Sequence, residues 1–285
     1  MRFALVNDEI KEAQQGLSGT CKCCGHPTTA KCGQVKIWHW AHSGKRICDT
    51  WWENESEWHR AWKNYFPTDW QEFIHYDHNG ERHIADIKTS QGYILEFQHS
   101  YLNPEERKKR TEFYGKIAWV VDGTRRRRDK EKFFEMINKS SSLCASPIVR
   151  IVCSSDSILL SEWYLTQAPV FFDFGEELLY CLLPNFIGSW RYFVEFPRSL
   201  FISLNQGAFQ AEQCFEDCLN KLYIFAAEHR KNALFKIKHN LDTWYWRKNY
   251  KPTQEEINMQ NQASNHLKKL YERFQIVMKP YFGAG

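Results

Sequence analysis

The chain has 285 residues, of which 43% are hydrophobic and 16% aromatic, and its formal net charge is +4. This composition excludes a chain that is disordered throughout, and the length suffices for two modest domains. So small a net charge does not by itself indicate a nucleic-acid partner, because the placement of the charge matters more. No stretch is apolar for long enough to span a bilayer, and residues 1–17 lack the apolar core of a signal peptide. We therefore expect a cytoplasmic protein with no membrane partner.

The first region, residues 1–52, is rich in cysteine and histidine. A C-x-x-C pair is followed by a second group of histidine and cysteine, and two ligands from each group would complete a tetrahedral structural zinc site. The predicted Zn²⁺ ligands are Cys21, Cys24, His42 and Cys48, with His39 as the main substitute and Cys23 and Cys32 as weaker ones. The alternatives are reduced cysteines beside a tryptophan cluster, or a redox-active cysteine pair.

The second region, residues 53–124, alternates helix and strand signals. Asn54 followed by Glu57 resembles a capping box, which predicts a helix from Asn54 to about Phe66, where Pro67 ends it. The turn sequences Asp-His-Asn-Gly and Thr-Ser-Gln-Gly separate apolar segments that read as strands. Strands are expected at residues 71–76, 82–88, 93–99 and 117–121, and a second helix at 104–114. The predicted order is helix, three strands, helix, strand.

Acidic residues lie inside two of these apolar strands. Asp86 follows Ile84 and Ala85 on the second strand, and Glu96 follows Leu95 on the third. Acidic residues are unusual in such surroundings, and the two strands form a hairpin that can bring both carboxylates to one edge. Gln98 shares the face of Glu96, because side chains two residues apart on a strand point to the same side.

Such carboxylates suit a hard divalent cation. Mg²⁺ and Mn²⁺ prefer oxygen ligands, activate water and neutralise the charge of a scissile phosphate. Glu55, at the start of the preceding helix, can join Asp86 and Glu96 at this site. The alternative is that these acids are solvated strand residues.

Several linked motifs occur in order in this part of the chain. They are Glu55-Ser56-x-x-His59, His83-Ile84-Ala85-Asp86, Leu95-Glu96-Phe97-Gln98-His99-Ser100, Glu106-Arg107 and Trp119-Val120-Val121-Asp122. Together with the C-x-x-C pair and His39-Trp40-Ala41-His42, they resemble the CoiA-like family of competence proteins over roughly residues 16–123. That family is regarded as a branch of the PD-(D/E)XK nucleases.

The resemblance implies an α/β (α+β) restriction-endonuclease-like core of the order αβββαβ. It also implies that Glu55, Asp86 and Glu96 are the acidic active-site positions and that Gln98 takes the position usually held by lysine. Glutamine is typical of this branch, but a neutral amide supplies no positive charge, although it can position a water molecule.

Further candidate site residues lie on the two helices. His59 and Lys63 follow Glu55 by four and eight residues and so share its helix face. Lys63 could contact a phosphate, and His59 could orient an acidic ligand or relay a proton, although a packing role for His59 fits nearly as well. Arg107 and Arg110 could face DNA or form a solvated face.

Basic residues gather after the second helix. Between Arg107 and Lys132 there are eleven Lys or Arg and four Asp or Glu. The run Arg125, Arg126, Arg127 and Arg128 directly follows the last strand of the core. Beside an acidic metal site, such a cluster favours a polyanionic partner, which we expect to be DNA, with RNA not excluded.

The third region, residues 125–285, contains no catalytic motif. Residues 148–160 and 193–204 have strand character, and residues 208–238 and 255–278 show the apolar spacing of helices. We expect a mixed, mainly helical accessory domain that recognises a substrate structure, a partner protein or a second protomer.

The sequence therefore predicts a Mg²⁺- or Mn²⁺-dependent nuclease, expected to be an endonuclease, with a structural zinc module. Its role could lie in competence, in recombination or in defence against foreign DNA, including phage DNA. A second hypothesis is a catalytically silent DNA-binding or recombination-mediator protein on the same fold, which the neutral Gln98 favours. A third is a zinc-dependent adaptor that binds other proteins.

Overall fold

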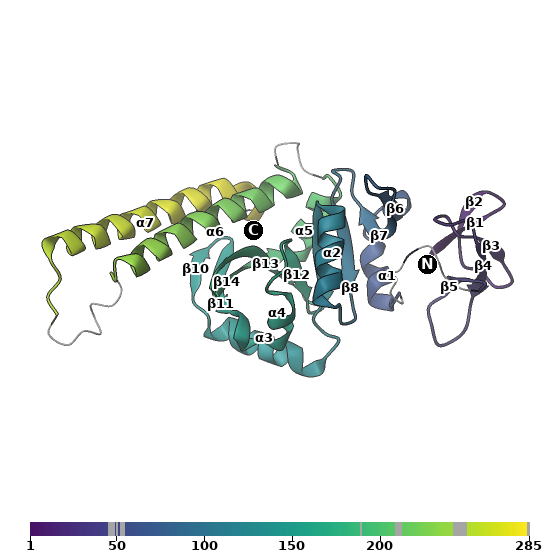
Figure 1. The fold of residues 1–285 in the computed structure, drawn as a ribbon, viewed down its shortest axis with the longest axis horizontal. Coiled ribbons are helices and arrows are strands. Elements are labelled where there is room, and N and C mark those ends of the chain that lie inside the picture. The colour runs from purple at the N-terminus through teal and green to yellow at the C-terminus, as the bar shows by residue number, and fades with distance from the viewer. Residues whose placement is uncertain are drawn as a thin grey trace. The chain divides into compact units, whose positions relative to one another are not determined.

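A computed structural model describes residues 1–44, 49, 51, 55–188, 190–208, 213–241 and 250–283. The chain divides into two compact units, Met1–Arg125 and Arg126–Gly285. Each unit combines strands and helices (Figure 1), so the expected mixed α/β class is confirmed. The first two of the three predicted regions lie within the N-terminal unit.

The N-terminal unit begins with a small antiparallel sheet that the sequence reasoning did not foresee. Its strands are β1 (Phe3–Val6), β2 (Glu9–Glu12), β3 (Ser18–Thr20), β4 (Pro27–Lys31) and β5 (His39–His42), in the spatial order β2-β1-β3-β4-β5. Asn7 and Asp8 have positive φ of 52° and 64° and join β1 to β2 in a two-residue hairpin turn. Buried Trp40, Met1 and Cys21 belong to the core of this sheet.

The rest of this unit has the predicted order of helix, three strands, helix and strand. The elements are α1 (Glu57–Lys63), η1 (Thr68–Trp70), β6 (Gln71–Tyr76), β7 (Arg82–Lys88), β8 (Ile94–Gln98), α2 (Pro104–Tyr114) and β9 (Ile117–Asp122). The strands lie in the order β9-β8-β7-β6, with β8 and β9 parallel and the other pairs antiparallel. Helix α2 makes the crossover that a parallel pair requires.

Aromatic packing fixes the helices against these strands. Phe97 on β8 stacks on Trp62 of α1, with ring centroids 5.5 Å apart. Trp119 on β9 donates its indole N–H to Thr111 of α2 at 3.2 Å. Trp119 pairs with Glu96, the neighbour of Phe97, and neighbouring residues of a strand face opposite sides. Helices α1 and α2 therefore cover opposite faces.

Helix α1 begins later than the sequence predicted. Ser56 is its N-cap and accepts a hydrogen bond from the backbone N–H of His59 at 3.3 Å. The predicted cap, Asn54, lies outside the described residues, and Glu57 is the first helical residue. The capping-box assignment of Glu57 is therefore wrong, because Ser56 is an equally strong capping residue two positions later.

The C-terminal unit contains a second antiparallel arrangement of strands. They are β10 (Ser142–Ala145), β11 (Ile148–Cys153), β12 (Val170–Asp173), β13 (Leu178–Ile187) and β14 (Trp190–Pro197), in the order β10-β11-β14-β13-β12. The helical elements of this unit are α3 (Arg127–Lys139), η2 (Ser154–Asp156), α4 (Ile158–Trp163), α5 (Arg198–Asn205), α6 (Phe215–Lys238) and α7 (Gln254–Phe282).

Adjacent phenylalanines on β12 build the core on both faces of these strands. Phe172 packs against Phe133 of α3, with centroids 5.6 Å apart. Phe171, which faces the other side, packs against Phe201 of α5 and Phe215 of α6. The strands of this unit are thus covered by α3 on one face and by α5 and α6 on the other.

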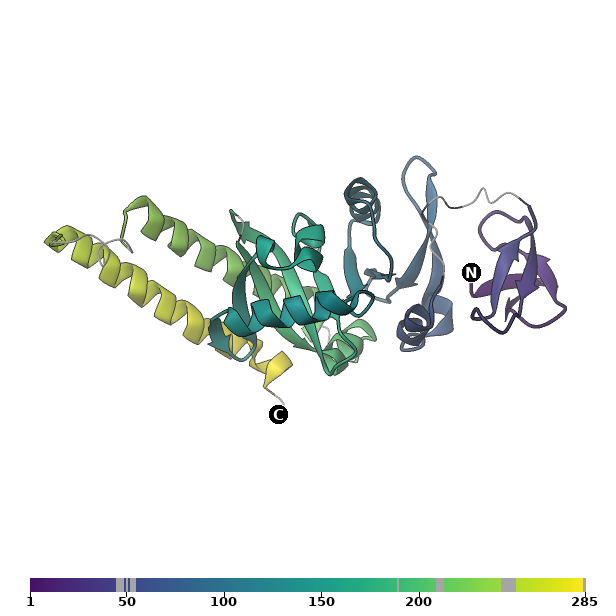
Figure 2. The ribbon, with the colours of Figure 1, turned by 90° about the horizontal axis from the view of Figure 1, so that it is seen from below.

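Helices α6 and α7 lie side by side as a long hairpin (Figure 2). Phe225 of α6 stacks on Phe274 of α7, with ring centroids 3.9 Å apart. Thr253 and Glu256 form a reciprocal capping box at the start of α7. No helix in the described parts of the chain has the length and apolarity needed to cross a membrane.

Two strand predictions in this unit extend too far. Strand β11 ends at Cys153, and α4 begins at Ile158 because Ser157 caps it by accepting the N–H of Leu160. Strand β14 ends at Pro197, after which α5 begins. Both errors come from apolar runs whose residues suit a buried helix as well as a strand.

Candidate functional site

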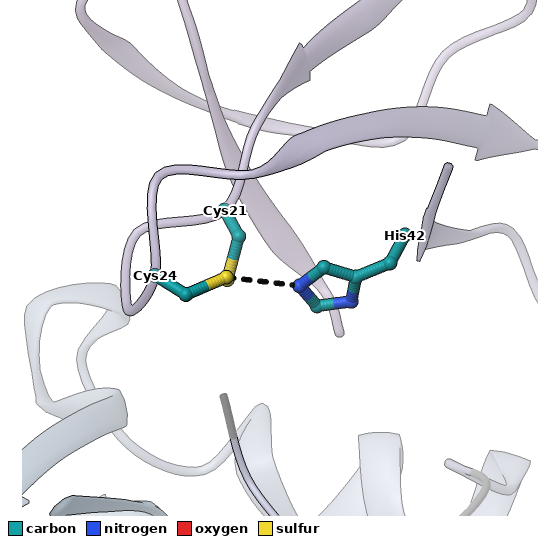
Figure 3. Close-up of side chains that lie close together, drawn as sticks. All are labelled: Cys21, Cys24 and His42. Carbon is teal, nitrogen blue, oxygen red and sulfur yellow. Dashed lines mark hydrogen bonds between the residues drawn. The ribbon is translucent and has the colours of Figure 1, made fainter. Parts of the chain in front are cut away.

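The cysteine and histidine residues of the first sheet meet in one cluster (Figure 3). The ligand atoms of Cys21, Cys24 and His42 all lie within 4.8 Å of one another, and Cys24 Sγ is 3.3 Å from His42 Nε2. Two sulfurs and one imidazole nitrogen are donors that zinc prefers. This group could therefore bind a metal such as zinc.

The turn between the two cysteines has the form of a metal-binding knuckle. Gly25 has a positive φ of 71° and donates its N–H to the carbonyl of Cys21 at 2.9 Å. The N–H of Cys23 points at Cys21 Sγ, 3.4 Å away, as a backbone donor does toward the sulfur of a knuckle. Burial raises the pKa of the Cys23 thiol itself, so Cys23 suits packing better than ligation.

The other predicted zinc ligands have different outcomes. His39 is not part of the cluster, because it lies three residues before His42 on β5 and so points to the other side of the strand. Its Nδ1 instead donates to the carbonyl of Ile37 at 2.8 Å. Cys48 lies outside the described residues.

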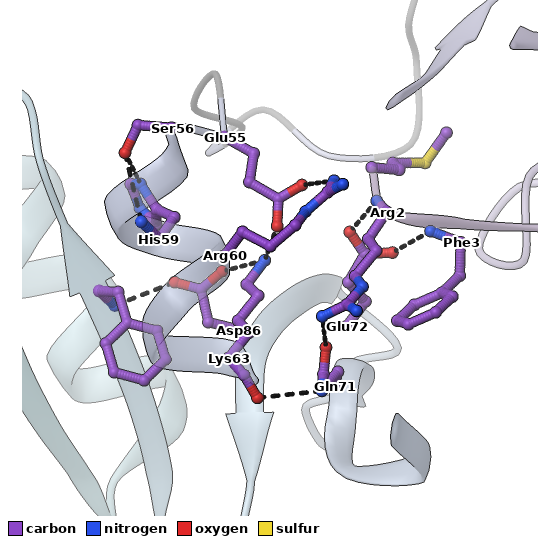
Figure 4. Close-up of polar contacts among 12 residues, drawn as sticks. Arg2, Phe3, Glu55, Ser56, His59, Arg60, Lys63, Gln71, Glu72 and Asp86 are labelled. Carbon is purple, nitrogen blue, oxygen red and sulfur yellow. Dashed lines mark hydrogen bonds and ion pairs between the residues drawn. The ribbon is translucent and has the colours of Figure 1, made fainter. Parts of the chain in front are cut away.

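The predicted acidic residues line one pocket. Figure 4 shows two of them, Glu55 and Asp86, beside Lys63. The cavity has a volume of about 70 Å³. Its wall is formed by Met1, Asp49, Trp51, Glu55, His59, Lys63, Glu72, Ile84, Asp86, Glu96, Phe97, Gln98 and Arg110. At roughly 10–15 Å³ for each water molecule, the cavity holds a hydrated ion but not a nucleotide. A larger substrate would have to lie at its mouth.

Lys63 connects two of the acids. Its Nζ is 2.9 Å from Asp86 Oδ1 and 3.5 Å from Glu55 Oε1, and its side chain is only 5% exposed. Arg60 binds the other oxygen of Glu55 at 2.6 Å. Glu55 Oε1 accepts no hydrogen bond from the part of the chain that the structure describes. This buried oxygen could therefore act as a ligand of a cation.

Asp86 and Glu96 are joined through the backbone of their strands. The N–H of Asp86 donates to Glu96 Oε1 at 3.3 Å, and the N–H of Phe97 donates to Asp86 Oδ2 at 2.9 Å. Within the described residues, Glu55, Asp86 and Glu96 are not a ligand group as compact as the cysteine cluster. Lys63 occupies the space between Glu55 and Asp86.

The electrostatics of the pocket separate its carboxyl groups. Burial raises the pKa of Glu55, but the charges of Lys63 and Arg60 outweigh burial and bring this pKa to about 2. Burial likewise opposes ionisation of Asp86, yet Lys63 and His59 hold its pKa below the usual value. Both groups are thus carboxylates at neutral pH.

Glu96 has the opposite shift. Burial and the neighbouring charge of Asp86 raise the pKa of Glu96 to about 8, although Arg110 counteracts them. The pKa of Lys63 is raised, because Asp86 and Glu55 outweigh the effect of burial. At neutral pH Lys63 is therefore charged, Glu55 and Asp86 are carboxylates, and Glu96 is largely protonated.

Arg107 and Arg110 are buried and so do not form an exposed pair that faces DNA. They are 5% and 7% exposed. Arg110 lies 3.5 Å from Glu96 and binds Glu106 through its Nε at 3.0 Å. The alternative of a solvated face is wrong, and the observed partners of Arg110 are acids of the same unit.

Gln98 and His59 both line the pocket. The amide of Gln98 donates to the carbonyl and hydroxyl oxygens of Ser100 at 3.2 and 3.4 Å. His59 is 4% exposed, and its Nδ1 is 3.1 Å from the hydroxyl of Ser56. The buried position of His59 fits the packing role that the sequence left open, and its contribution to the pKa of Asp86 also ties it to the site.

Three further residues of the site were missed from the sequence. Asp49, whose side chain is 7% exposed, accepts the N–H of Ile84 at 3.1 Å and binds His83 at 2.9 Å. Glu72 and Arg60 complete the set. No local pattern in a single sequence marks Asp49 or Glu72 as a member of the pocket, because the fold brings them there. Arg60 resembles any exposed helical arginine.

The basic run after β9 is only partly exposed. Arg126 binds Asp129 at 2.5 Å and Glu162 at 2.8 Å, so it holds α3 and α4 together. Arg127 and Arg128 are exposed, whereas Arg125 is half-buried. Of the four residues, Arg127 and Arg128 are thus the best placed for a phosphate backbone.

Comparisons of this chain with models of protein families, with curated proteins and with solved structures give no match.

Proposed function

We propose that this chain is a metal-dependent nuclease that hydrolyses phosphodiester bonds of DNA. The observation that carries the proposal is that Glu55, Asp86, Glu96 and Lys63 line one pocket. They come from the segment before α1, from α1 itself and from the β7–β8 hairpin. The order helix, three strands, helix, strand supports an assignment to the PD-(D/E)XK nucleases. The resemblance of the motifs to the CoiA-like family supports it further.

Glu55, Asp86 and Glu96 would hold Mg²⁺ or Mn²⁺. When bound, this cation lowers the pKa of a water molecule and neutralises charge on the scissile phosphate. Glu55 Oε1, which accepts no hydrogen bond from the described residues, and the ionised carboxylate of Asp86 fit a hard cation. Glu96 would lose its proton as it becomes a ligand.

Lys63 supplies the positive charge that Gln98 lacks. Its ammonium group lies 2.9 Å from Asp86, so it stands beside the proposed cation site. There it can hold a phosphate oxygen, while the amide of Gln98 orients the attacking water. The acids and Lys63 thus divide the roles that the usual PD-(D/E)XK pattern gives to two carboxylates and one lysine.

Zn²⁺ is proposed for the cluster of Cys21, Cys24 and His42, with Cys48 as the fourth ligand. Four protein ligands would leave no open position for water, so this metal is structural.

A polynucleotide is the proposed substrate, because the cavity admits an ion but no nucleotide, so that the phosphate backbone would lie at its mouth. DNA is proposed because the motifs resemble the CoiA-like family. Arg127 and Arg128, which belong to the C-terminal unit, would contact phosphate groups of the nucleic acid, and RNA is the alternative polyanion. DNA uptake, recombination and defence against foreign DNA are the proposed settings. The C-terminal unit would recognise a substrate structure, a protein partner or a second protomer.

The test is cleavage of supercoiled plasmid, linear duplex and single-stranded DNA with Mg²⁺, Mn²⁺ or EDTA. The wild type should cut with metal and not with EDTA. Asp86→Asn, which keeps the shape but removes the charge, should lower the rate at least about 100-fold, as removal of one charge-stabilising group does. Asp69→Asn is the matched control, since Asp69 is exposed. Equal cutting by Asp86→Asn would refute the proposed site.

The second candidate is a catalytically silent DNA-binding protein. It is favoured by the position of Lys63 between Glu55 and Asp86, where its charge already satisfies both acids. Binding of DNA without cutting, unchanged by Mg²⁺ and by Asp86→Asn, would support this candidate over the nuclease.

A further inference from the structure

Glu72 on β6 holds the backbone of the first strand at the wall of the acidic pocket (Figure 4). Its Oε1 accepts the N–H of Arg2 at 2.5 Å, and its Oε2 accepts the N–H of Phe3 at 3.1 Å. Glu72 is 8% exposed and has a positive φ of 49°. A non-glycine residue adopts this conformation at a cost, so the surrounding contacts must stabilise it.

The same strand borders the cysteine cluster. Cys21 Sγ lies 3.6 Å from Met1 Sδ, and the N–H of Trp40 donates to the carbonyl of Met1 at 2.9 Å. Leu5 of β1 pairs with Thr20, the residue before Cys21. The position of β1 therefore depends on the core that surrounds the metal ligands.

On its other side, β1 reaches the acidic pocket. Met1 lines this pocket, and so does Ile84, which packs against the core of the first sheet. The guanidinium of Arg2 donates to Gln71 Oε1 at 2.9 Å, and Gln71 Nε2 donates to the carbonyl of Lys63 at 3.0 Å. A continuous set of contacts thus runs from Cys21 through Met1 and Arg2, which lead into β1, and through Gln71 to Lys63.

We infer that Glu72 is a positioning residue that couples metal loading of the cysteine cluster to the order of the acidic pocket. The metal is a thiolate-preferring cation such as Zn²⁺. A small module gains much of its folding energy from such a metal. Loss of the metal loosens β1, removes two donors from the buried carboxylate of Glu72 and releases Gln71 and α1. The inference rests on the proposed function only in that its pocket is the proposed catalytic one.

Amide hydrogen exchange of the full chain tests the coupling without any cleavage. The zinc-loaded protein is compared with protein stripped of zinc by a chelator, with no Mg²⁺ added. Stripping should speed exchange in β1 and also in α1, each at least tenfold, whereas α3 of the other unit should stay unchanged. Faster exchange in β1 with α1 unchanged within twofold would overturn the inference.

Variants separate positioning from general stability. Glu72→Gln should speed exchange in α1 while zinc is bound, and stripping should then add no further increase in α1. Glu9→Gln is the control, because the side chain of Glu9 is 72% exposed on β2 and pairs with Lys11, outside the contacts that run from Cys21 to Lys63. If Glu72→Gln does not fold, Glu72→Gly replaces it, since glycine adopts a φ of 49° without strain. A full stripping effect in α1 of either variant would refute the role of Glu72.

Cleavage is measured on portions of the same two preparations, after the chelator is removed and Mg²⁺ is added, to keep the two proposals apart. A wild type that never cuts DNA but shows the coupled exchange supports the coupling and contradicts the nuclease. A wild type that cuts DNA equally well with and without zinc, with α1 exchange unchanged, supports the nuclease and contradicts the coupling.

Discussion

The N-terminal unit gathers buried charged side chains in one pocket, in addition to its aromatic core. In the N-terminal unit, Glu55, Lys63 and Glu96 are buried beside one another, with side chains 5–7% exposed. The core of the C-terminal unit is built from aromatic rings such as Phe133 and Phe171, which are fully buried. Buried ion pairs contribute little net stability compared with apolar residues of similar size. The contrast teaches that the gathered charges of the first unit add little to the stability of the fold, whereas the packed rings of the second unit stabilise it.

Burial nevertheless acts on both units by the same physical rule, since it disfavours the charged form of a group. It raises the pKa of Glu96 to about 8 in the first unit and lowers the pKa of His229 to about 4 in the second. Glu96 and His229 should therefore make contributions to stability that respond to pH in opposite directions.

The largest expected effect is that of Lys63→Met. This change removes the cation that Glu55 and Asp86 share, leaves Glu55 with Arg60, and should lower the free energy of unfolding by about 3–5 kcal/mol. Chemical denaturation of the metal-free protein measures it. Lys108→Met, at a side chain 75% exposed, should change stability by less than about 0.5 kcal/mol. If Lys63→Met leaves the free energy of unfolding unchanged, the contrast between the two units fails, because the pocket would then tolerate apolar residues as the core of the second unit does.

The next effect is the pH dependence that Glu96 gives the metal-free protein. Its pKa in the folded state, about 8, exceeds the ordinary 4.5. The folded state therefore binds the extra proton, and the stability from Glu96 is present below pH 4.5 and is lost as the pH rises through 8. The loss should be of the order of 3 kcal/mol. Denaturation midpoints between pH 4.5 and 8 measure it.

Glu96→Gln should remove this loss, and Glu57→Gln, at an exposed position, should not. The same pH slope in the wild type and in Glu96→Gln would show that another group is responsible.

His229 should produce a smaller effect of the opposite sign. It accepts or donates a hydrogen bond at 3.0 Å with the Tyr192 hydroxyl, and burial lowers its pKa from 6.5 to about 4. Its contribution is present above pH 6.5 and is lost as the pH falls through 4, by about 2 kcal/mol. Unfolding of the second unit, followed by hydrogen exchange of α6, should show this loss, and His229→Phe should abolish it. His266→Phe is the exposed control, and an unchanged slope in His229→Phe would contradict the assignment.

The smallest effect concerns the exposed arginines. Arg127→Ala with Arg128→Ala should weaken DNA binding a few-fold and reduce the slope of log K against log salt by about 1 for each lost phosphate contact. Binding titrations at several salt concentrations measure this slope. Lys251→Ala, at an exposed position of the chain, should leave it unchanged. If the variant with both arginines replaced keeps the wild-type slope, the two arginines do not contact DNA.

Local signals were enough to predict the elements around the pocket. Strands β6 and β7 have the predicted bounds, because turns with glycine at positive φ separate them, as at Gly80 and Gly92. Helix α2 begins at Pro104 after Asn103, as predicted, because a side-chain cap and a proline at the first position are strong local signals. The start of α1 was missed because two capping residues compete there.

Some features of the candidate site could likewise be predicted from local sequence signals, and others could not. The sequence by itself determined which carboxylates stand inside apolar strands, Asp86 and Glu96, and that Cys21 and Cys24 share a knuckle, because these features depend on spacing of a few residues. Only the tertiary structure decided that Lys63 lies between Glu55 and Asp86, that Arg110 faces Glu96, and that Glu72 holds the first strand. These contacts join residues 8 to 70 positions apart. Their geometry is set by how the sheets and helices pack, which no local pattern encodes.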